Sequence, residues 1–331
     1  MRLTNSSSSS RFEVLLNSFF SVFSLRRKEL NQMGVPTEAP KMLARGRYQF
    51  TAYLSNKSYF FRIAEYKDLD GNKYIAKIWT SKNKDKNYYR IKNELVAYRT
   101  FWEILQSEEY NKITKDFDIS IPKLEYYEEE KTRLVLLLEK IPGVPLGEIP
   151  NKERIRVVDQ SITFLQTLFE SSENPTKLGL RNIKPLFFIL MIFLLMPLSL
   201  AKNLKLAPSL LKLYLFVPLS VIPILKCKEL SFVHRDLHPW NIISVKEKSY
   251  LFDLEIISIG PKSHDLGNAI FRSWNMEDNA ALIEYMNNLK TSTNYYELKF
   301  MCIYGLVYDL VFNVSDTIPR AKGFIEYLKY F

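Results

Sequence analysis

Two cysteines and only ten glycines occur among the 331 residues, and each shortage excludes a class of protein or site. Cys227 and Cys302 stand far apart and outside any Cys-x-x-Cys pattern, which excludes a disulfide framework and favours a reducing compartment. The three histidines lack partners at zinc-ligand spacing, so a structural zinc site is not expected. The scarcity of glycine also means that no glycine-rich phosphate loop can be found.

Acidic residues are absent between Asn174 and Lys228, although the whole chain contains 36 of them. The same stretch carries eight basic residues, which account for most of the net charge of +10. These basic residues border two apolar runs, Leu186 to Ala201 and Leu213 to Leu225. Such a pattern suits an anionic lipid surface better than a phosphate groove, so nucleic acid is not an expected partner.

The apolar runs form an insert at about 184–226, which we call the apolar insert. Each run is shorter than the roughly 20 residues that a membrane-spanning helix needs. Two interpretations therefore stay open. The bordering lysines favour peripheral membrane contact through the insert, whereas an apolar helical subdomain, or a docking face for a partner, would explain the same composition.

Residues 1–45 have the composition of an N-terminal extension. Ser6 to Ser10 is a polar run with no reason to fold, and a short apolar stretch ending at Arg26 follows it. A signal peptide fits poorly, because the apolar part is short and interrupted. We expect either a disordered segment or an amphipathic helix, and Met33 is an alternative start of the chain.

The segment at 46–141 has the pattern of a small antiparallel sheet with one packed helix. Short β-branched and aromatic runs predict strands at 48–54, 59–66, 73–79, 123–127 and 134–138. Apolar residues at steps of three and four from Tyr88 to Leu105 predict a helix with one buried face. Glu94 lies on that face, and burying an acid without a partner is costly.

The loop from His234 to Asn241 carries the chemistry. Asp236 and Asn241 lie five residues apart, and Asp253 follows a predicted hairpin over 241–245 and 249–252. If that hairpin forms, the three side chains converge on one small volume. Phosphoryl transfer from ATP needs a carboxylate to orient the attacking hydroxyl, and oxygen ligands for Mg²⁺. The sequence therefore predicts a phosphotransferase site here.

In these motifs the chain resembles the kinase-like phosphotransferases, most closely the aminoglycoside phosphotransferase and choline kinase group. That group has a loop of the form His-x-Asp-Leu-His-x-x-Asn and a later Asp-x-Glu, which His234 to Asn241 and Asp253 to Glu255 match. The resemblance implies a two-lobed, protein-kinase-like α+β fold. The small antiparallel-sheet N-lobe, at 46–141, would bind nucleotide, and the mainly helical C-lobe, at 142–331, would carry the catalytic loop and the apolar insert.

The resemblance also implies a role for each residue of the motifs. Asp236 would be the catalytic aspartate, with His238 beside it fixing the loop or the transferred phosphate. Asn241 and Asp253 would be the ligands of Mg²⁺. His234 and Asp265 would support the loop.

Further residues are implied to bind ATP. Lys77 would grip the phosphates, with Glu94 as its charge partner, because a buried lysine without one is unfavourable. Glu139 and Ile141 belong to the hinge whose backbone would hydrogen-bond adenine, and Ile243 would form the floor of the adenine pocket.

Two departures from the group concern the phosphates and the acceptor. Ser55 to Ser58 stands where a glycine-rich hairpin would cover the phosphates. Only 11 residues separate Asp253 from Asp265, which leaves no room for a protein-kinase activation loop. The acceptor is therefore expected to be a small or lipid-linked molecule with a hydroxyl, not a protein.

We expect an ATP- and Mg²⁺-dependent phosphotransferase acting in the cytoplasm, at the inner face of the membrane. The acid-free insert favours a membrane-held acceptor, such as a glycolipid sugar or a lipid head group, over a polycationic antibiotic. Two alternatives stay open. One is a soluble sugar, choline-like or antibiotic kinase, and the other is a membrane-tethered pseudokinase that binds without turnover.

Overall fold

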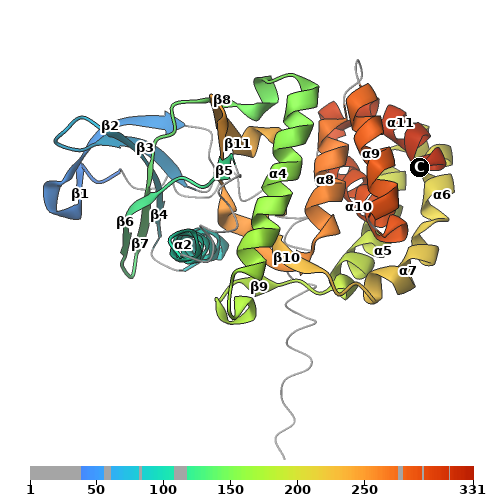
Figure 1. The fold of residues 1–331 in the computed structure, drawn as a ribbon, viewed down its shortest axis with the longest axis horizontal. Coiled ribbons are helices and arrows are strands. Elements are labelled where there is room, and N and C mark those ends of the chain that lie inside the picture. Colours follow the sequence, from blue (N-terminus) through green and yellow to red (C-terminus); the bar gives the residue numbers. More distant parts are fainter. Residues whose placement is uncertain are drawn as a thin grey trace, which may run out of the picture.

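The structure, a computed structural model, describes residues 39–55, 61–81, 84–107, 118–274, 279–292, 294–312 and 314–331. Most of the predicted N-terminal extension, and the turn at 56–58, lie outside these residues. Figure 1 shows a curled sheet with one helix at one end of the molecule and a larger, helical part at the other. This is the α+β arrangement that the sequence predicts.

A six-stranded antiparallel sheet forms the smaller end, in the order β1-β2-β3-β4-β7-β6. Its strands are β1 (Met42–Leu43), β2 (Tyr48–Ser55), β3 (Arg62–Lys67), β4 (Lys73–Thr80), β6 (Leu124–Glu129) and β7 (Arg133–Glu139). All five predicted strands are present, and the described part of the second begins at Arg62. In β4, Ala76 and Ile78 are buried in the core on one face, so Lys77 projects from the other.

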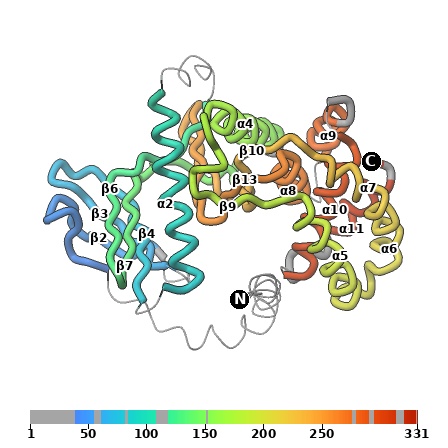
Figure 2. The backbone as a smooth tube through the Cα atoms, turned by 90° about the horizontal axis from the view of Figure 1, so that it is seen from below, coloured from blue at the N-terminus to red at the C-terminus, as the bar shows by residue number. Residues whose placement is uncertain are grey.

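Helix α2 (Lys86–Leu105) covers the face of the sheet to which Lys77 belongs (Figure 2). Asp85 caps its N-terminus by accepting hydrogen bonds from the amides of Asn87 and Tyr88, the usual reason for an acid at this position. Ile91, Glu94, Leu95 and Tyr98 are buried, as the periodicity predicts. The helix therefore presents the Glu94 carboxylate to the sheet.

The chain leaves the sheet through a close crossing at Gly143. Strand β8 (Val144–Pro145) pairs with β11 (Ile242–Val245), which forms a hairpin with β12 (Lys248–Leu251). A Cβ on Gly143 would lie 2.4 Å from the carbonyl oxygen of Ser244 and 2.6 Å from Ile243, so only glycine fits. The predicted hinge thus packs directly against the hairpin of the catalytic loop.

The larger part is built on helices, with two small sheets beside them. The helices are α4 (Asn151–Glu170), α8 (Ser263–Ser273), α9 (Ala280–Ser292), α10 (Tyr295–Phe312) and α11 (Val314–Tyr330). The remaining strands are β5 (Ile119–Ser120), β9 (Arg181–Asn182), β10 (Leu230–Val233) and β13 (Ser258–Pro261). These strands were not predicted, because most of them are too short to show a period. Strand β10, paired with β13, leads into the catalytic loop, and β5 pairs with β12 of the hairpin that follows the loop.

The apolar insert forms α5 (Pro185–Lys202), α6 (Ala207–Tyr214) and α7 (Val217–Leu225). These helices lie at the end of the molecule farthest from the six-stranded sheet (Figures 1 and 2). Helix α5 is long and apolar enough to cross a membrane, and 28% of its apolar stretch is buried. The chain from Leu204 to Leu225 passes the same test as a pair of helices bent by 52°.

Candidate active site

The loop after β10 is held by a buried carboxylate. Asp265, in the first turn of α8, accepts hydrogen bonds from the backbone amides of His234 and Arg235. Burial acts to raise the pKa of Asp265, but His264, then His234 and the amide of Arg235, outweigh burial and lower it. The imidazole Nε2 of His234 lies 2.9 Å from the carbonyl oxygen of Phe252. The loop is therefore fixed to a helix on one side and to the β11–β12 hairpin on the other.

Two backbone positions at the site lie in the left-handed region. Arg235 has φ of 68°, and Asp253 has φ of 61°. Aspartate tolerates this conformation better than most residues, whereas arginine does so only when its surroundings hold it there. Strained residues of this kind concentrate at functional sites. Here Arg235 precedes Asp236 in the loop, and Asp253 begins the segment after β12.

The carboxylate of Asp236 is only a third exposed and has several partners. Arg272, at the end of α8, donates to Oδ1 at 2.7 Å. On the other oxygen, Asn241 Nδ2 lies 3.4 Å from Oδ2 and His238 Nε2 lies 3.7 Å from it. The amide of Asn241 also donates to the backbone carbonyl of Asp236 at 3.0 Å. The structure thus brings Asp236, His238 and Asn241 together.

The imidazole of His238 is oriented by its own backbone segment. Its Nδ1 accepts a hydrogen bond from the amide of Trp240 at 3.1 Å. Burial disfavours the imidazolium and lowers the pKa of His238, although the nearby Asp236 opposes the shift. A neutral His238 with its proton on Nε2 points that proton toward Asp236.

Lys77 joins the sheet to the segment that follows β12. Its ammonium lies 2.7 Å from Glu94, 2.7 Å from Asp253 and 3.5 Å from Glu255. Burial disfavours this ammonium, but the three carboxylates outweigh burial and raise the pKa of Lys77 above its ordinary value. The Glu94 contact is the one that the sequence predicts, and the contact with Asp253 was not predicted.

The cluster around Lys77 has an excess of negative charge. One ammonium faces three carboxylates, and burial raises the pKa of Glu94 to about 7 although Lys77 opposes the shift. Within the described ranges, no group of three or more His, Cys, Asp or Glu side chains could hold a metal by itself. Mg²⁺ in nucleotide sites usually takes only one or two protein oxygens and completes its shell with phosphates and water. The cluster therefore fits a cation that arrives with a nucleotide.

Asn241 and Asp253 lie at adjoining points of the hairpin. The amide of Phe252, the residue before Asp253, donates to the carbonyl oxygen of Asn241 at 3.1 Å. In the structure the Asp253 side chain pairs with Lys77, while the Asn241 amide turns toward Asp236. Both side chains border the same loop.

The hinge residues differ from one another in what their backbones can offer. The amide of Glu139 donates to the carbonyl of Lys123 at 2.9 Å, so this amide is not free for a ligand. Lys140 likewise donates to Lys73. Among the described residues, the amide of Ile141 has no such partner. Ile243 is half-buried against the crossing at Gly143, two residues after Ile141 in the chain.

Sequence reasoning missed a chain of charges behind Asp236. Arg272 lies 3.6 Å from Asp309 of α10, and Arg320 of α11 lies 3.4 Å from the same buried carboxylate. In the separate cluster around Lys77, sequence reasoning also missed that Glu255 contacts both Lys77 and Arg90. The one available signal was the position of Arg272, seven residues or two turns after Asp265, on the same face of one helix.

Comparisons with known proteins show the family and the fold of the chain. A family model described as "Phosphotransferase enzyme family" matches residues 112–300. No curated protein matches the chain.

Solved structures share the fold. An aminoglycoside phosphotransferase from Alicyclobacillus acidocaldarius aligns with a TM-score of 0.54 and 13% identity, over 89% of this chain and 97% of the other. A macrolide 2'-phosphotransferase from Brachybacterium faecium aligns with a TM-score of 0.54 and 12% identity, over 86% and 93%. An aminoglycoside phosphotransferase in complex with ADP and hygromycin B aligns with a TM-score of 0.50 and 14% identity, over 93% and 98%.

The two-lobed, kinase-like α+β fold that the motifs predicted is thereby confirmed. The family match spans the catalytic loop, Asp253 and Asp265, and it covers more than half of the chain. The chain belongs to the phosphotransferase enzyme family, and it is an ATP-dependent phosphotransferase that acts on a hydroxyl group.

Proposed function

We propose that this kinase transfers the γ-phosphoryl group of Mg²⁺-bound ATP to a hydroxyl of a non-protein acceptor, with Asp236 as the catalytic aspartate. The observation that carries the proposal is the 2.7 Å contact between Lys77 of the sheet and Asp253 of the segment after β12. This contact supports the proposal because it joins a cation of the sheet to a carboxylate that would bind Mg²⁺, and phosphoryl transfer needs both beside the phosphates.

In the reaction, the acceptor oxygen forms a bond to the γ-phosphorus while the bond to the bridging oxygen of ADP breaks. Asp236 accepts the hydroxyl proton, and His238 fixes the loop beside it. Asn241 and Asp253 would hold Mg²⁺, which when bound neutralises charge on the phosphates. Lys77, kept charged and positioned by Glu94, grips the phosphates. Asp265 and His234 keep the loop in register.

For the adenine ring, we propose the strip between the hinge and β11. The free amide of Ile141 and the carbonyl of Glu139 would hydrogen-bond the ring edge, and Ile243 would lie under its face. With this division, residues 46–141 form the nucleotide-binding N-lobe and 142–331 the catalytic C-lobe. The kinase would act in the cytoplasm.

We further propose that the acceptor is held at the inner face of the membrane, as a glycolipid sugar or a lipid head group. The support is the insert, which has no acid between Asn174 and Lys228 and keeps many apolar side chains exposed. A soluble sugar, choline-like or antibiotic acceptor is the runner-up, and the proteins that share the fold include enzymes for antibiotics.

The test of the proposed chemistry is ATP turnover by the purified protein. Wild type with ATP and Mg²⁺ should release ADP slowly without acceptor, and Asp236→Asn should lower turnover by about a hundredfold or more. Glu148→Gln, an exposed acid on the same side of the hinge, is the matched control and should behave as wild type. Equal rates for Asp236→Asn and wild type would instead support a binding protein without turnover.

The acceptor is found by incubating the enzyme with labelled ATP and either a membrane lipid extract or a soluble metabolite extract. Labelled product in the lipid fraction alone supports the membrane-held acceptor. Labelled product only from the soluble extract would favour the runner-up.

A further inference from the structure

Exposed apolar side chains are concentrated in the apolar insert. Half of all exposed large apolar side chains among the described residues lie between Leu186 and Leu225. Phe193 is 46% exposed, Leu215 is 76% and Leu219 is 64%. Exposed apolar side chains gathered in one insert point to an interaction site, because monomeric proteins normally avoid large exposed apolar surfaces.

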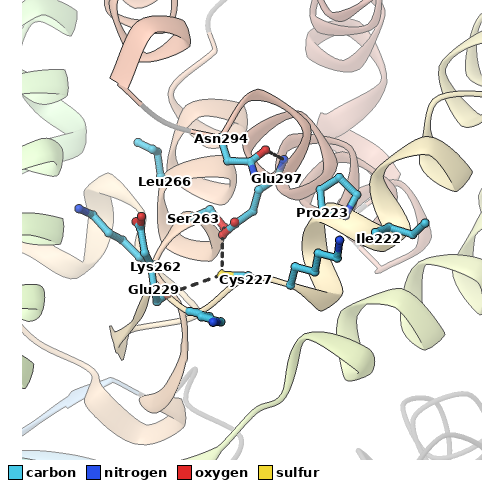
Figure 3. A pocket seen from close by; sticks show the side chains of 11 residues that line it. Ile222, Pro223, Cys227, Glu229, Lys262, Ser263, Leu266, Asn294 and Glu297 are labelled. Carbon is cyan, nitrogen blue, oxygen red and sulfur yellow. Dashed lines mark hydrogen bonds between the residues drawn. The ribbon is translucent and has the colours of Figure 1, made fainter.

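A pocket of about 490 Å³ opens beside this apolar surface, between the end of α7 and the starts of α8 and α10 (Figure 3). Ile222, which is 63% exposed and belongs to the apolar surface, also lines the pocket. Three lysines line it as well: Lys226, Lys228 and Lys262. The pocket thus joins an apolar rim to a group of cations.

The acids of the pocket do not cancel these lysines. Glu297 is 7% exposed and accepts hydrogen bonds from the hydroxyl of Ser263 and the thiol of Cys227, as Figure 3 shows. The Cys227 pKa is raised to about 12, first by burial and then by Glu297, so this thiol stays a neutral donor. Against two acids, Glu229 and Glu297, the three lysines leave a net positive charge.

We propose that this pocket binds the phosphate head group of an anionic phospholipid, while the exposed face of α5 to α7 lies on the bilayer. Lysines at a bilayer surface attract anionic lipids, and apolar side chains beside them reach the acyl region. The proposal deepens the proposed function, since the membrane would carry the acceptor, but the pocket is a separate site. It lies where β10 begins, beside Glu229, whereas the catalytic loop follows the other end of that strand.

Charge argues against a second copy of this chain as the occupant. The stretch from Asn174 to Lys228, which contains the insert, has eight basic residues and no acid, so a symmetric contact through the insert would oppose like charges. An anionic bilayer supplies both the complementary charge and the apolar phase.

The proposal is tested by co-sedimentation of the full chain with vesicles. Phosphatidylcholine vesicles are compared with vesicles in which part of the phosphatidylcholine is replaced by phosphatidylglycerol. Wild type should bind the anionic vesicles about tenfold more tightly or better. Lys226→Glu/Lys228→Glu should abolish that preference. Lys131→Glu/Lys152→Glu, which changes the net charge equally at exposed positions elsewhere, should keep it.

The exposed face of α5 to α7 is tested by a separate variant and control. Leu215→Glu/Leu219→Glu should lose binding to both kinds of vesicle, whereas Leu69→Glu, on a turn of the sheet where the leucine is 92% exposed, should not. All variants should release ADP at the wild-type basal rate, so a failure of binding is distinguishable from a failure of the phosphotransferase chemistry.

Two outcomes would overturn the proposal. In the first, Lys226→Glu/Lys228→Glu and the control Lys131→Glu/Lys152→Glu reduce binding to anionic vesicles equally. That result would show a nonspecific effect of net charge. The other is a dimer in light scattering that Leu215→Glu/Leu219→Glu dissociates, with no vesicle binding by wild type, which would make the face a contact between copies.

Discussion

Arg272 donates to Asp236 at 2.7 Å, and the same guanidinium lies 3.6 Å from the buried carboxylate of Asp309. Asp309 is 3% exposed and is shared with Arg320. The proposed catalytic aspartate is therefore one end of a chain of alternating charges that passes through α8, α10 and α11. Arg272 occupies one carboxylate oxygen of Asp236 and leaves the other, near Asn241 and His238, for an acceptor hydroxyl.

From this geometry we predict that Arg272 acts as a positioning residue. Arg272→Ala should lower kcat about tenfold to a hundredfold with little change in KM for ATP, because Asp236 loses its fixed orientation while the phosphate contacts remain. Asp309→Asn should also lower kcat. In the double variant the fold decrease in kcat should be smaller than the product of the two single decreases, because both residues act through the same contact. Steady-state kinetics over a range of ATP concentrations measures all three.

The variant Arg272→Lys distinguishes a loss of Asp236 orientation from a general loss of folding. It keeps a cation near Asp236 but loses the planar fork, so partial recovery of kcat relative to Arg272→Ala is expected. If Arg272→Ala instead raised KM for ATP and left kcat unchanged, the residue would act on nucleotide binding, and the positioning role would be wrong.

Lys77 is predicted to act chiefly on ATP. Removing the ammonium in Lys77→Ala takes away the phosphate contact and leaves Glu94, 1% exposed, without its partner. We expect kcat/KM for ATP to fall by about a hundredfold or more. Thermal stability should also drop, because breaking a buried ion pair strands a charge. Lys73→Ala on the same strand, whose side chain is 59% exposed, is the matched control and should change neither quantity appreciably. Nucleotide use unchanged in Lys77→Ala would mean that the phosphates lie elsewhere.

Stability should depend on pH through Glu94. Burial raises the pKa of Glu94 to about 7 from its ordinary value of 4.5, so between these values the folded protein retains a proton that the unfolded chain has released. The contribution of Glu94 to the free energy of unfolding is thus fully present below pH 4.5 and is lost as pH rises through 7. Between pH 4.5 and about 7 this contribution falls by about 3 kcal/mol.

The measurement compares wild type with Glu94→Gln, which cannot titrate, by denaturant unfolding at several pH values. The difference in unfolding free energy, wild type minus variant, should decrease as pH rises from 4.5 to 7. His238 has a lowered pKa and acts in the opposite sense, but it is common to both proteins and cancels. A difference that stays constant, or grows with pH, would contradict a raised pKa for Glu94.

The catalytic loop and its hairpin could be predicted because their chemistry lies in one contiguous segment. Asp236, Asn241 and Asp253 are recognisable from residue type and spacing, and the β11–β12 hairpin brings Asn241 and the residue before Asp253 side by side. The contact between Lys77 and Glu94 was also within reach, since a buried acid on a helix face demands a cation nearby.

Arg272 and Asp309 were not predictable, because their contact exists only once α8 packs on α10. The apolar insert is helical, as expected, but the bounds of its three helices were not predictable. The residues of α5 and α7 are apolar on nearly every side, so these two helices show little amphipathic period. Pro197 and Pro223 also lie inside them, although proline usually interrupts a helix. In both cases tertiary packing supplied the information that the local pattern lacked.

The packing of α8 on α10 yields a last prediction. A Cβ added at Gly267 of α8 would lie 2.6 Å from the backbone carbon of Met301 and 2.7 Å from the amide of Cys302. Because backbone cannot yield as a side chain can, Gly267→Ala should force the helices apart and destabilise the protein by about 1–3 kcal/mol. Asp265 and Arg272 lie on the same helix, so kcat should fall as well. Gly305→Ala on the facing helix is the control, since its Cβ would meet Asn268 at an ordinary 3.4 Å. Denaturant unfolding of both variants measures the difference, and equal stability would show that α8 and α10 are less closely packed in solution than this contact requires.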